Sequence, residues 1–367
     1  MEGKLSYQIV KMPLLMPFET SFGRQFDRVA LIFRLDADGI TSYSECVTDT
    51  DPFYSYENNF TALEIIDKYL ASHIPKLPEP GEFMEQVSYV KGHNMAKAAL
   101  EMLLWDYHAR RNGIPLDRYL GRSKGKAEVG ISFGMDPIET TISRISNALD
   151  MGYKRIKVKI KKGKELGILG PIRDRFPDIS LTADANCDYS IKDMDLLKKI
   201  DRFNLQYLEQ PLGHDDLIYH AKLAKSMSTP ICLDESITEV EKARKAFEIG
   251  AGEVINIKPG RVGGLTNSIA ISEVVRENGG HCWVGGMLET GIGRAYNVAM
   301  ASNSNVDYAG DTSPNSRYFK KDIVLNPFVM KDGFIEVNRG NGTGAEVDTN
   351  ALSGYKTAEG VIKVWKM

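Results

Sequence analysis

Five charged residues recur along the middle of the chain at a nearly constant interval. Lys159, Asp184, Glu209, Asp234 and Lys258 lie 25, 25, 25 and 24 residues apart (from 184 − 159 to 258 − 234). Each one ends or follows a short apolar run with the length and β-branched content of a strand. The interval matches one strand plus one helix with their loops. The chain is therefore predicted to repeat strand–helix units, with one charge at the same end of each.

Predicted strands and helices alternate through residues 126–314. The strands are Glu128–Phe133, Arg155–Ile160, Ser180–Ala183, Tyr207–Glu209, Ile231–Asp234, Val254–Ile257 and His281–Val284. The clearest helices between them are Pro137–Met151, Asp193–Phe203 and Glu239–Ile249. This alternation predicts an α/β fold, a (β/α)7β barrel of the TIM type with a parallel sheet. The five charges would then meet at the carboxyl ends of the strands, where active sites of such barrels form.

Residues 1–125 follow another pattern, which predicts an α+β capping domain. Strands are expected at Ser6–Val10 and Arg28–Leu35, a hairpin turn at Asp38-Gly39, and helices at Glu57–Ser72 and Asn94–Asn112. The charged, glycine-containing stretch 121–126 is the expected boundary with the barrel. The last segment, 315–367, is irregular, and its predicted strand Gly333–Asn338 is expected to return to the capping domain.

Composition excludes several classes of partner and location. The 46 basic and 49 acidic residues give a net charge of −3, which gives no reason to expect nucleic acid or an anionic membrane as partner. No apolar run reaches the length of a membrane span, and no signal-peptide pattern opens the chain. The four cysteines form no CxxC pair, which suits a reducing compartment. A cytoplasmic protein is expected.

Three of the recurring charges are carboxylates, and their convergence predicts a metal site. Asp184, Glu209 and Asp234 at adjacent strand ends would repel one another unless a cation lay between them. An oxygen-only ligand set favours Mg²⁺ or Mn²⁺ over zinc, and the HExxH motif of zinc enzymes is absent. A single Asp at a strand end is usually a helix cap or a loop ion pair. Five charges in phase on consecutive strands argue against that simpler interpretation.

The two lysines flank the carboxylates in sequence and would face each other across a closed barrel. Lys157 lies two residues before Lys159, so both point to the same side of their strand. Partial burial, a neighbouring ammonium and a metal each lower a lysine pKa, which makes the lysine a base near neutrality. A carboxylate substrate would place its α-carbon between Lys159 and Lys258. Proton removal there gives an enediolate.

A serine hydrolase is the alternative suggested by Gly130-Ile-Ser132-Phe-Gly134, which matches GxSxG. No histidine has a clear relation to Ser132. The serine-hydrolase alternative is therefore disfavoured. As a separate point, His281 lies on the seventh predicted strand with no aspartate after it on that strand, which argues against the His–Asp dyad of a mandelate-racemase-like arrangement.

Several motifs together resemble the enolase superfamily, in its muconate-lactonizing subgroup. They are Lys157-Val-Lys159, Ala183-Asp184-Ala-Asn186, Leu208-Glu209-Gln-Pro211, Leu233-Asp234-Glu-Ser236 and the segment from Ile257-Lys258 to Gly264. Within that subgroup, Gly285–Arg294, Gly310-Asp-Thr-Ser313 and Arg317-Tyr-Phe are most similar to the o-succinylbenzoate synthase / N-succinylamino acid racemase family. The resemblance covers nearly the whole chain.

The resemblance implies a role for each site residue. Lys159 and Lys258 would be the acid/base pair, and Asp184, Glu209 and Asp234 would hold Mg²⁺ or Mn²⁺. Supporting or electrostatic roles are implied for Lys157, Asn186, Glu235 and Arg261, the last resembling an arginine of racemase-capable members. Substrate binding is implied for Phe18 and Phe22 of a closing loop, for Ser132, and for Gly285, Gly286 and Met287, whose segment would offer backbone N–H groups.

Two reactions share this apparatus, and the sequence leaves both open. One is dehydration to o-succinylbenzoate in menaquinone biosynthesis, and the other is racemisation of an N-succinylamino acid. Another muconate-lactonizing-type racemase, epimerase or cycloisomerase is the alternative, and a non-catalytic binding barrel is less favoured. Asp307 and Asp311 are four apart, unlike the Asp-x-Asp of dipeptide epimerases, so dipeptides are disfavoured. A small carboxylate substrate and a homo-oligomer are expected.

Overall fold

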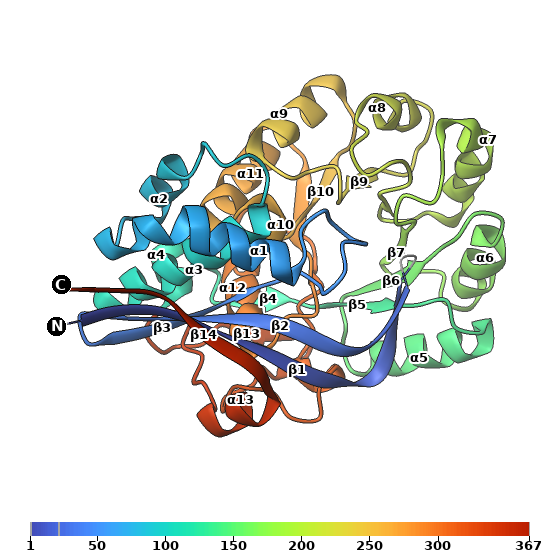
Figure 1. The fold of residues 1–367 in the computed structure, drawn as a ribbon. Helices are drawn as coiled ribbons and strands as arrows, with labels where there is room; N and C mark the ends of the chain where they lie inside the picture. Colours follow the sequence, from blue (N-terminus) through green and yellow to red (C-terminus); the bar gives the residue numbers. More distant parts are fainter. Residues whose placement is uncertain (1, 21–22, 367) are drawn as a thin grey trace.

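The computed structural model describes residues 2–20 and 23–366, and of residues 18–20 and 23 only the backbone. The chain forms a ring of strands enclosed by helices, with a long antiparallel sheet and its own helices beside it (Figure 1). The start of the first strand and the end of the last strand lie side by side at one end of that antiparallel sheet, where Glu2 pairs with Lys366 (Figure 1). The predicted fold, a TIM-like barrel with an α+β cap, is confirmed.

The cap sheet has four antiparallel strands in the order β14-β1-β2-β3. Their bounds are β14 (Lys356–Lys366), β1 (Glu2–Thr20), β2 (Gly23–Ala37) and β3 (Ile40–Cys46). Asp38 and Gly39 join β2 to β3 with φ of 51° and 76°, the left-handed backbone that a two-residue hairpin turn requires. The hairpin predicted from Asp38-Gly39 is therefore present.

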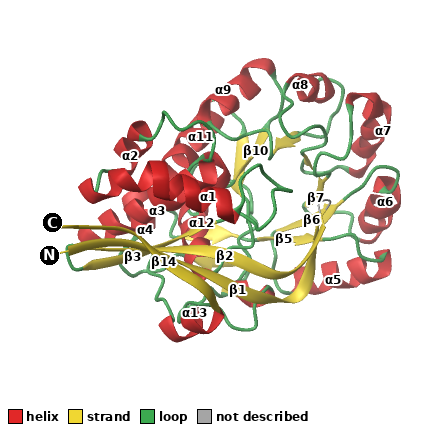
Figure 2. Ribbon diagram, viewed as in Figure 1, coloured by secondary structure: helices red, strands yellow, loops and turns green. Residues whose placement is uncertain are grey.

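Helices cover one face of the cap sheet (Figure 2). They are α1 (Asn59–Ile65), the π-helical turn η1 (Ile66–Leu70), the 3-10 turn η2 (Ala71–Lys76), α2 (Pro80–Gln86), α3 (Asn94–Arg111) and α4 (Leu116–Leu120). α3 is buried on nearly all sides because it lies between the cap sheet and the barrel. In the described part of the chain, no helix has both the length and the hydropathy to cross a bilayer.

Seven parallel strands form the barrel sheet in sequence order. They are β5 (Gly130–Phe133), β6 (Arg155–Lys159), β7 (Leu181–Asp184), β8 (Leu208–Glu209), β9 (Ile231–Leu233), β10 (Val254–Ile257) and β11 (His281–Val284). Residues 307–311 close the ring, since the Asp311 N–H donates to Val284 and the Gly130 N–H donates to Gly310. The predicted eighth strand is thus a short segment with hydrogen bonds on both sides.

Helices surround the barrel strands on the outside (Figure 2). They are α5 (Ile138–Asp150), α6 (Glu165–Arg175), η3 (Ile191–Asp193), α7 (Met194–Leu197), η4 (Lys198–Phe203), α8 (Ile218–Ala224), α9 (Val240–Ile249), α10 (Pro259–Val262), α11 (Leu265–Glu277) and α12 (Gly291–Ala301). Their apolar faces and the outward faces of the strands make the main core. The charged side chains at the carboxyl ends of these strands, such as Lys159, Asp184 and Glu209, are not part of this apolar core.

The C-terminal segment returns to the cap by a strand other than the predicted one. It contains η5 (Asn315–Arg317), β12 (Met330–Lys331), β13 (Phe334–Glu336), α13 (Thr349–Tyr355) and β14. β13, within the predicted strand Gly333–Asn338, pairs with β4 (Lys126–Glu128) at the start of the barrel, where Ile335 and Ala127 are both fully buried. The expectation that Gly333–Asn338 joins the cap is wrong, because β14 pairs with β1 there.

Candidate active site

The five recurring charges all lie at the carboxyl ends of consecutive barrel strands. Lys159, Asp184 and Glu209 are the last residues of β6, β7 and β8, and Asp234 and Lys258 directly follow β9 and β10. In the sheet register Lys159 pairs with Asp184, and Asp184 with Glu209. These three residues are therefore in register, and all five charges lie at the carboxyl ends of their strands, as the spacing predicts.

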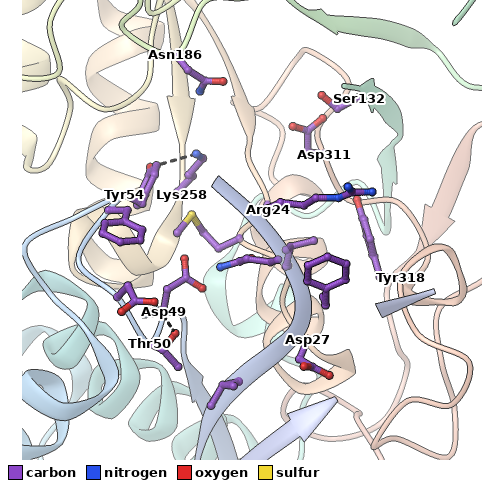
Figure 3. A pocket seen from close by; sticks show the side chains of 18 of the residues that line it. Arg24, Asp27, Asp49, Thr50, Tyr54, Ser132, Asn186, Lys258, Asp311 and Tyr318 are labelled. Atoms are coloured by element: carbon purple, nitrogen blue, oxygen red, sulfur yellow. Dashed lines mark hydrogen bonds between the residues drawn. The ribbon is translucent and has the colours of Figure 1, made fainter. Parts of the chain in front are cut away.

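A cavity of about 510 Å³ opens at this end of the barrel, between the barrel and the cap. Predicted site residues that line it are Lys157, Lys159, Asp184, Asn186, Asp234, Lys258, Ser132, Gly286 and Met287. The cap contributes residues from the β1–β2 hairpin and from the loop after β3, including Arg24, Asp49 and Tyr54 (Figure 3). Four other predicted site residues are not part of the lining: Glu209, Glu235, Arg261 and Gly285.

The two candidate acid/base lysines stand on opposite sides of the barrel. β6 and β10 are four strands apart in a ring of seven strands and one closing segment. The Lys159 ammonium donates to Asp184 Oδ2 at 2.7 Å and to the Asn186 side chain. The Lys258 ammonium donates to Asp234 Oδ2 at 2.8 Å. Each lysine thus has its own carboxylate, and the cavity lies between them.

Lys157 occupies the centre of a buried charge network. Its Nζ lies 2.9 Å from Glu209 Oε2, 2.8 Å from Asp311 Oδ2 and 3.5 Å from Asp184 Oδ2. Burial alone would lower the pKa of Lys157, but the three carboxylates raise it above its ordinary value. The carboxylates therefore favour the charged form of Lys157.

The pKa of Lys258 is likewise raised in this arrangement. Burial lowers this pKa, whereas the Tyr54 phenol and the carboxylates of Glu235 and Glu209 raise it. The raising effects are together the larger, so the pKa of Lys258 lies above its ordinary value. The sequence predicts that burial and neighbouring ammonium groups lower the lysine pKa. At Lys157 and Lys258 the net shift of the pKa is instead upward. The carboxylates outweigh both effects.

The remaining supporting residues lie behind the lysines. Arg261 is buried; it donates to the carboxylate of Asp234 and, through Nε, to the Ile237 carbonyl at 2.9 Å. Glu235 is also buried, and its Oε1 accepts from Asn186 Nδ2 at 3.3 Å. Burial, together with the charge of Asp184, raises the pKa of Glu235 despite the opposing effect of Lys258. Lys157, Asn186 and Arg261 thus contact the lysines or the carboxylates directly, whereas Glu235 contacts Asn186.

The predicted substrate-binding residues fall into three groups. Phe22 lies outside the described residues, and Phe18 is described only as backbone of β1. Ser132 lines the cavity, and its buried hydroxyl has no hydrogen-bond partner in the part of the chain that the structure describes. This removes the nucleophile-elbow interpretation, because no histidine activates Ser132. Gly286 and Met287 line the same cavity.

One expectation about His281 is wrong. Its Nδ1 lies 2.6 Å from Asp307 Oδ2, so the His–Asp pair exists. Asp307 comes from the closing segment rather than from the strand of His281, so sequence proximity on one strand could not find it. His281 is the first residue of β11, so the pair lies at the end of the barrel opposite the cavity.

Residues that sequence reasoning missed include Tyr54, Arg155, Asp311 and Arg294. Asp311 accepts from Arg155 at 2.7 Å and lines the cavity, whereas the sequence marks it only by the Gly310–Ser313 motif and by its spacing from Asp307. Arg294 Nη2 lies 3.1 Å from Glu289, and Arg294 also lines the cavity. Tyr54 belongs to a loop without periodicity. Asp311 and Arg294 lie in segments that carry the family resemblance, but nothing in the sequence indicates their contacts, because those contacts join distant segments of the chain.

The donor chemistry of the site fits a hard divalent cation. The side chains there offer carboxylate and amide oxygens, and two of the buried oxygens, Glu235 Oε2 and Asn256 Oδ1, have no hydrogen-bond partner among the described residues. Within residues 2–20 and 23–366, no three His, Cys, Asp or Glu side chains are arranged as ligands of one ion. Each of the three candidate carboxylates pairs instead with a lysine or arginine.

Comparison with known proteins identifies the class of this protein. Residues 5–121 match the mandelate racemase / muconate lactonizing enzyme N-terminal domain, and residues 141–351 match the enolase C-terminal domain-like family. A solved member of the enolase superfamily from Listeria innocua superposes with a TM-score of 0.95 at 35% identity, over 98% of both chains. The chain belongs to the enolase superfamily and is an enzyme.

Relatives narrow the position within that superfamily. The chain is 42% identical to the N-succinylamino acid racemase of Thermus thermophilus over 93% of both chains. It is 40% identical to the o-succinylbenzoate synthase of Geobacillus kaustophilus, over 94% of this chain and 93% of that protein. The resemblance inferred from the motifs is therefore confirmed.

Proposed function

We propose that this enzyme removes the proton α to a carboxylate and passes through an enediolate, acting as an o-succinylbenzoate synthase, an N-succinylamino acid racemase, or both. One observation carries the proposal. Two ammonium groups, Lys159 and Lys258, stand across one cavity on strands half a barrel apart, each beside its own carboxylate. A planar enediolate between them has one lysine on each face.

The lysines would do the proton chemistry. In racemisation, one lysine as the free amine takes the α-proton and the other as ammonium returns a proton to the opposite face. In dehydration, Lys159 takes the α-proton and then helps the β-hydroxyl leave, while Lys258 stays charged and stabilises the enediolate. Lys157, which the carboxylates keep cationic, would add positive charge near the reacting carboxylate.

Asp184, Glu209 and Asp234 are the residues that would hold Mg²⁺ or Mn²⁺. When bound, such a cation stabilises the enediolate charge and takes up carboxylate charge that otherwise pairs with the lysines. Arg261 and Asn186 would then orient Asp234 and Lys159, to which they bind. Glu235 would add a further oxygen beside the site.

The other end of the substrate would lie toward Ser132 and the segment after β11. The Ser132 hydroxyl lacks a partner among the described residues, and the hydroxyl is a donor available for an acyl carboxylate. Backbone N–H groups of Gly285, Gly286 and Met287 would bind the same group, and Phe18 and Phe22 of the β1–β2 hairpin would cover it.

We keep the division at residues 125 and 314, the cytoplasmic location and the homo-oligomer as parts of this proposal.

The test is deuterium uptake at the α-carbon of N-succinylamino acids in D₂O, together with turnover of the synthase substrate. Exchange that is lost with EDTA for both enantiomers, and in Lys159→Ala for the enantiomer whose proton Lys159 removes, supports the proposal. Lys161→Ala is the matched control, because Lys161 is exposed on the same segment and does not line the cavity. Absence of both exchange and synthase turnover in the wild-type enzyme contradicts it. Comparing kcat/KM for the two substrates decides which reaction predominates.

A further inference from the structure

Tyr54 reaches from the cap to one of the two lysines. It lies in the loop between β3 and α1, and its hydroxyl accepts from Lys258 Nζ at 3.1 Å (Figure 3). The Lys258 Nζ also lies 4.8 Å from the centre of the Tyr54 ring. Arg261 Nη1 donates to the same hydroxyl at 3.4 Å. The phenol therefore contacts both the lysine and the arginine that bind Asp234.

The two lysines differ in where their hydrogen-bond partners come from. Lys159 donates to Asp184 and Asn186, which both belong to the end of β7 in the barrel. Lys258 donates to Asp234 in the barrel and to Tyr54 in the cap. Among these contacts, the cap supports only the lysine on the β10 side of the cavity.

The base of the Tyr54 loop is fixed by buried contacts. Arg28, which is 1% exposed, donates to Asp49 at 2.7 Å and to the Thr48 carbonyl at 3.0 Å. Across the loop, Thr48 Oγ1 donates to Asn59 at 2.7 Å, and the Asn59 N–H donates to the Asp49 carbonyl at 2.8 Å. The two ends of the loop are thus held together, which sets the position of Tyr54.

We propose that Tyr54 is a positioning residue that aims Lys258 at the α-carbon, so that proton transfer depends on the cap on one face of the substrate only. The inference rests on the proposed function. An ammonium has three N–H donors. Tyr54 accepts one of these N–H groups from the cap side and is not a candidate metal ligand, so its placement restricts where the other positions of Lys258 Nζ point, including the lone pair of the free amine. A lysine stem is flexible, so losing one partner widens the range of directions.

The proton transfer that Tyr54 assists can be written for one face. The lone pair of the neutral Lys258 amine takes the α-proton, and the electrons of the C–H bond move into the substrate carboxylate as the enediolate forms. Lys258 is then an ammonium, whose protons exchange with D₂O. Return of a deuteron to the α-carbon regenerates the amine and leaves the label in the substrate.

The experiment measures deuterium uptake separately for the two enantiomers of N-succinylphenylalanine with Mg²⁺ in D₂O. Lys159→Ala and Lys258→Ala first show which enantiomer each lysine deprotonates, because each variant retains exchange only on the other face. Tyr54→Phe, which keeps the ring but removes the hydroxyl, is expected to slow exchange on the Lys258 face about tenfold. Exchange on the Lys159 face stays within about twofold of wild type.

Tyr56→Phe is the matched control. Tyr56 belongs to the same loop, but its hydroxyl accepts from the His93 N–H at 3.1 Å and it does not line the cavity. Its exchange rates should equal those of wild type on both faces. Equal slowing of both faces in Tyr54→Phe, or no slowing, overturns this inference while leaving the proposed function intact. Failure of wild type to exchange either enantiomer overturns this inference, and the proposed function is overturned as well only if turnover of the synthase substrate is also absent.

Discussion

Gly285 lies directly against the side chain of Lys258. A β-carbon placed on Gly285 would stand 2.8 Å from Lys258 Cε and 2.2 Å from Asn256 Oδ1. Gly285 does not have a positive φ, so its backbone conformation is one that other residues also adopt. The glycine is therefore required for space. The backbone at Gly285 and the aliphatic part of the Lys258 side chain are so close that a methyl group does not fit between them.

Gly285→Ala is accordingly expected to displace Lys258 and lower kcat about a hundredfold, the cost of a misplacement near 1 Å at a reacting group. The measurement is steady-state kinetics on the synthase substrate and on an N-succinylamino acid. Gly134→Ala is the control, because its β-carbon would meet nothing within 4 Å. A Gly285→Ala enzyme with wild-type kcat would show that Lys258 adjusts freely.

Asp311 joins two buried cations, and its neutralisation should destabilise the fold. Its carboxylate lies 2.7 Å from Arg155 and 2.8 Å from Lys157, and these cations, against the effect of burial, hold its pKa well below the usual range. Asp311→Asn leaves both cations short of a partner, so we expect about 3–5 kcal/mol less free energy of unfolding.

Denaturant unfolding measures this loss. Asp307→Asn on the same closing segment is the comparison, because Asp307 pairs with His281 where both side chains are over 40% exposed, at 43% and 44%. That variant should change stability by less than about 1 kcal/mol. Equal stabilities of the two variants would mean that the Arg155–Asp311–Lys157 network contributes nothing.

Glu45 should make stability depend on pH. Burial, only partly offset by Arg28, raises the pKa of Glu45 from 4.5 to about 7. The folded state therefore binds more protons than the unfolded state between these values. The resulting stabilisation is fully present below the unfolded pKa and is lost as pH rises through the folded pKa.

Glu45→Gln removes this titration. The free energy of unfolding of wild type relative to Glu45→Gln should thus fall by up to about 3 kcal/mol between about pH 5 and pH 8. Chemical unfolding of both proteins at several pH values gives the difference. Glu64→Gln, which removes an exposed carboxylate paired with Lys68, is the control for the loss of one glutamate. A difference that rises with pH would contradict the burial argument.

The parts of the site that follow the barrel repeat could be predicted from the sequence. Lys159, Asp184 and Glu209 end their strands because a parallel barrel brings equivalent positions of successive units to one level. The Asp38-Gly39 turn was equally predictable, since few residue pairs accept φ > 0 at two positions. Local rules suffice where the chain's own period or backbone chemistry decides the outcome.

Contacts between distant segments could not be predicted in this way. Tyr54 reaches Lys258 only because buried Arg28 fixes the ends of its loop. The partner of His281 was missed because residues 307–311 lack a strand pattern and pair only through the closed ring. The sequence also did not indicate which C-terminal strand joins the cap. β14 pairs with β1, whereas β13 pairs with β4 and buries Ile335 there.

Removal of divalent cations should abolish activity without unfolding the protein. Each candidate ligand carboxylate has a cationic partner within the protein: Lys157 for Glu209, Lys159 for Asp184, and Lys258 for Asp234. Charge repulsion among the carboxylates is therefore compensated without a metal, unlike in small zinc domains that unfold on chelation. EDTA should eliminate α-proton exchange while far-UV circular dichroism stays unchanged, and added Mg²⁺ or Mn²⁺ should restore exchange. Lys157→Met removes the cation shared by Glu209 and Asp184, so this variant alone should lose structure when EDTA is added. Unfolding of the wild-type enzyme by EDTA would show that the three ion pairs do not replace the cation.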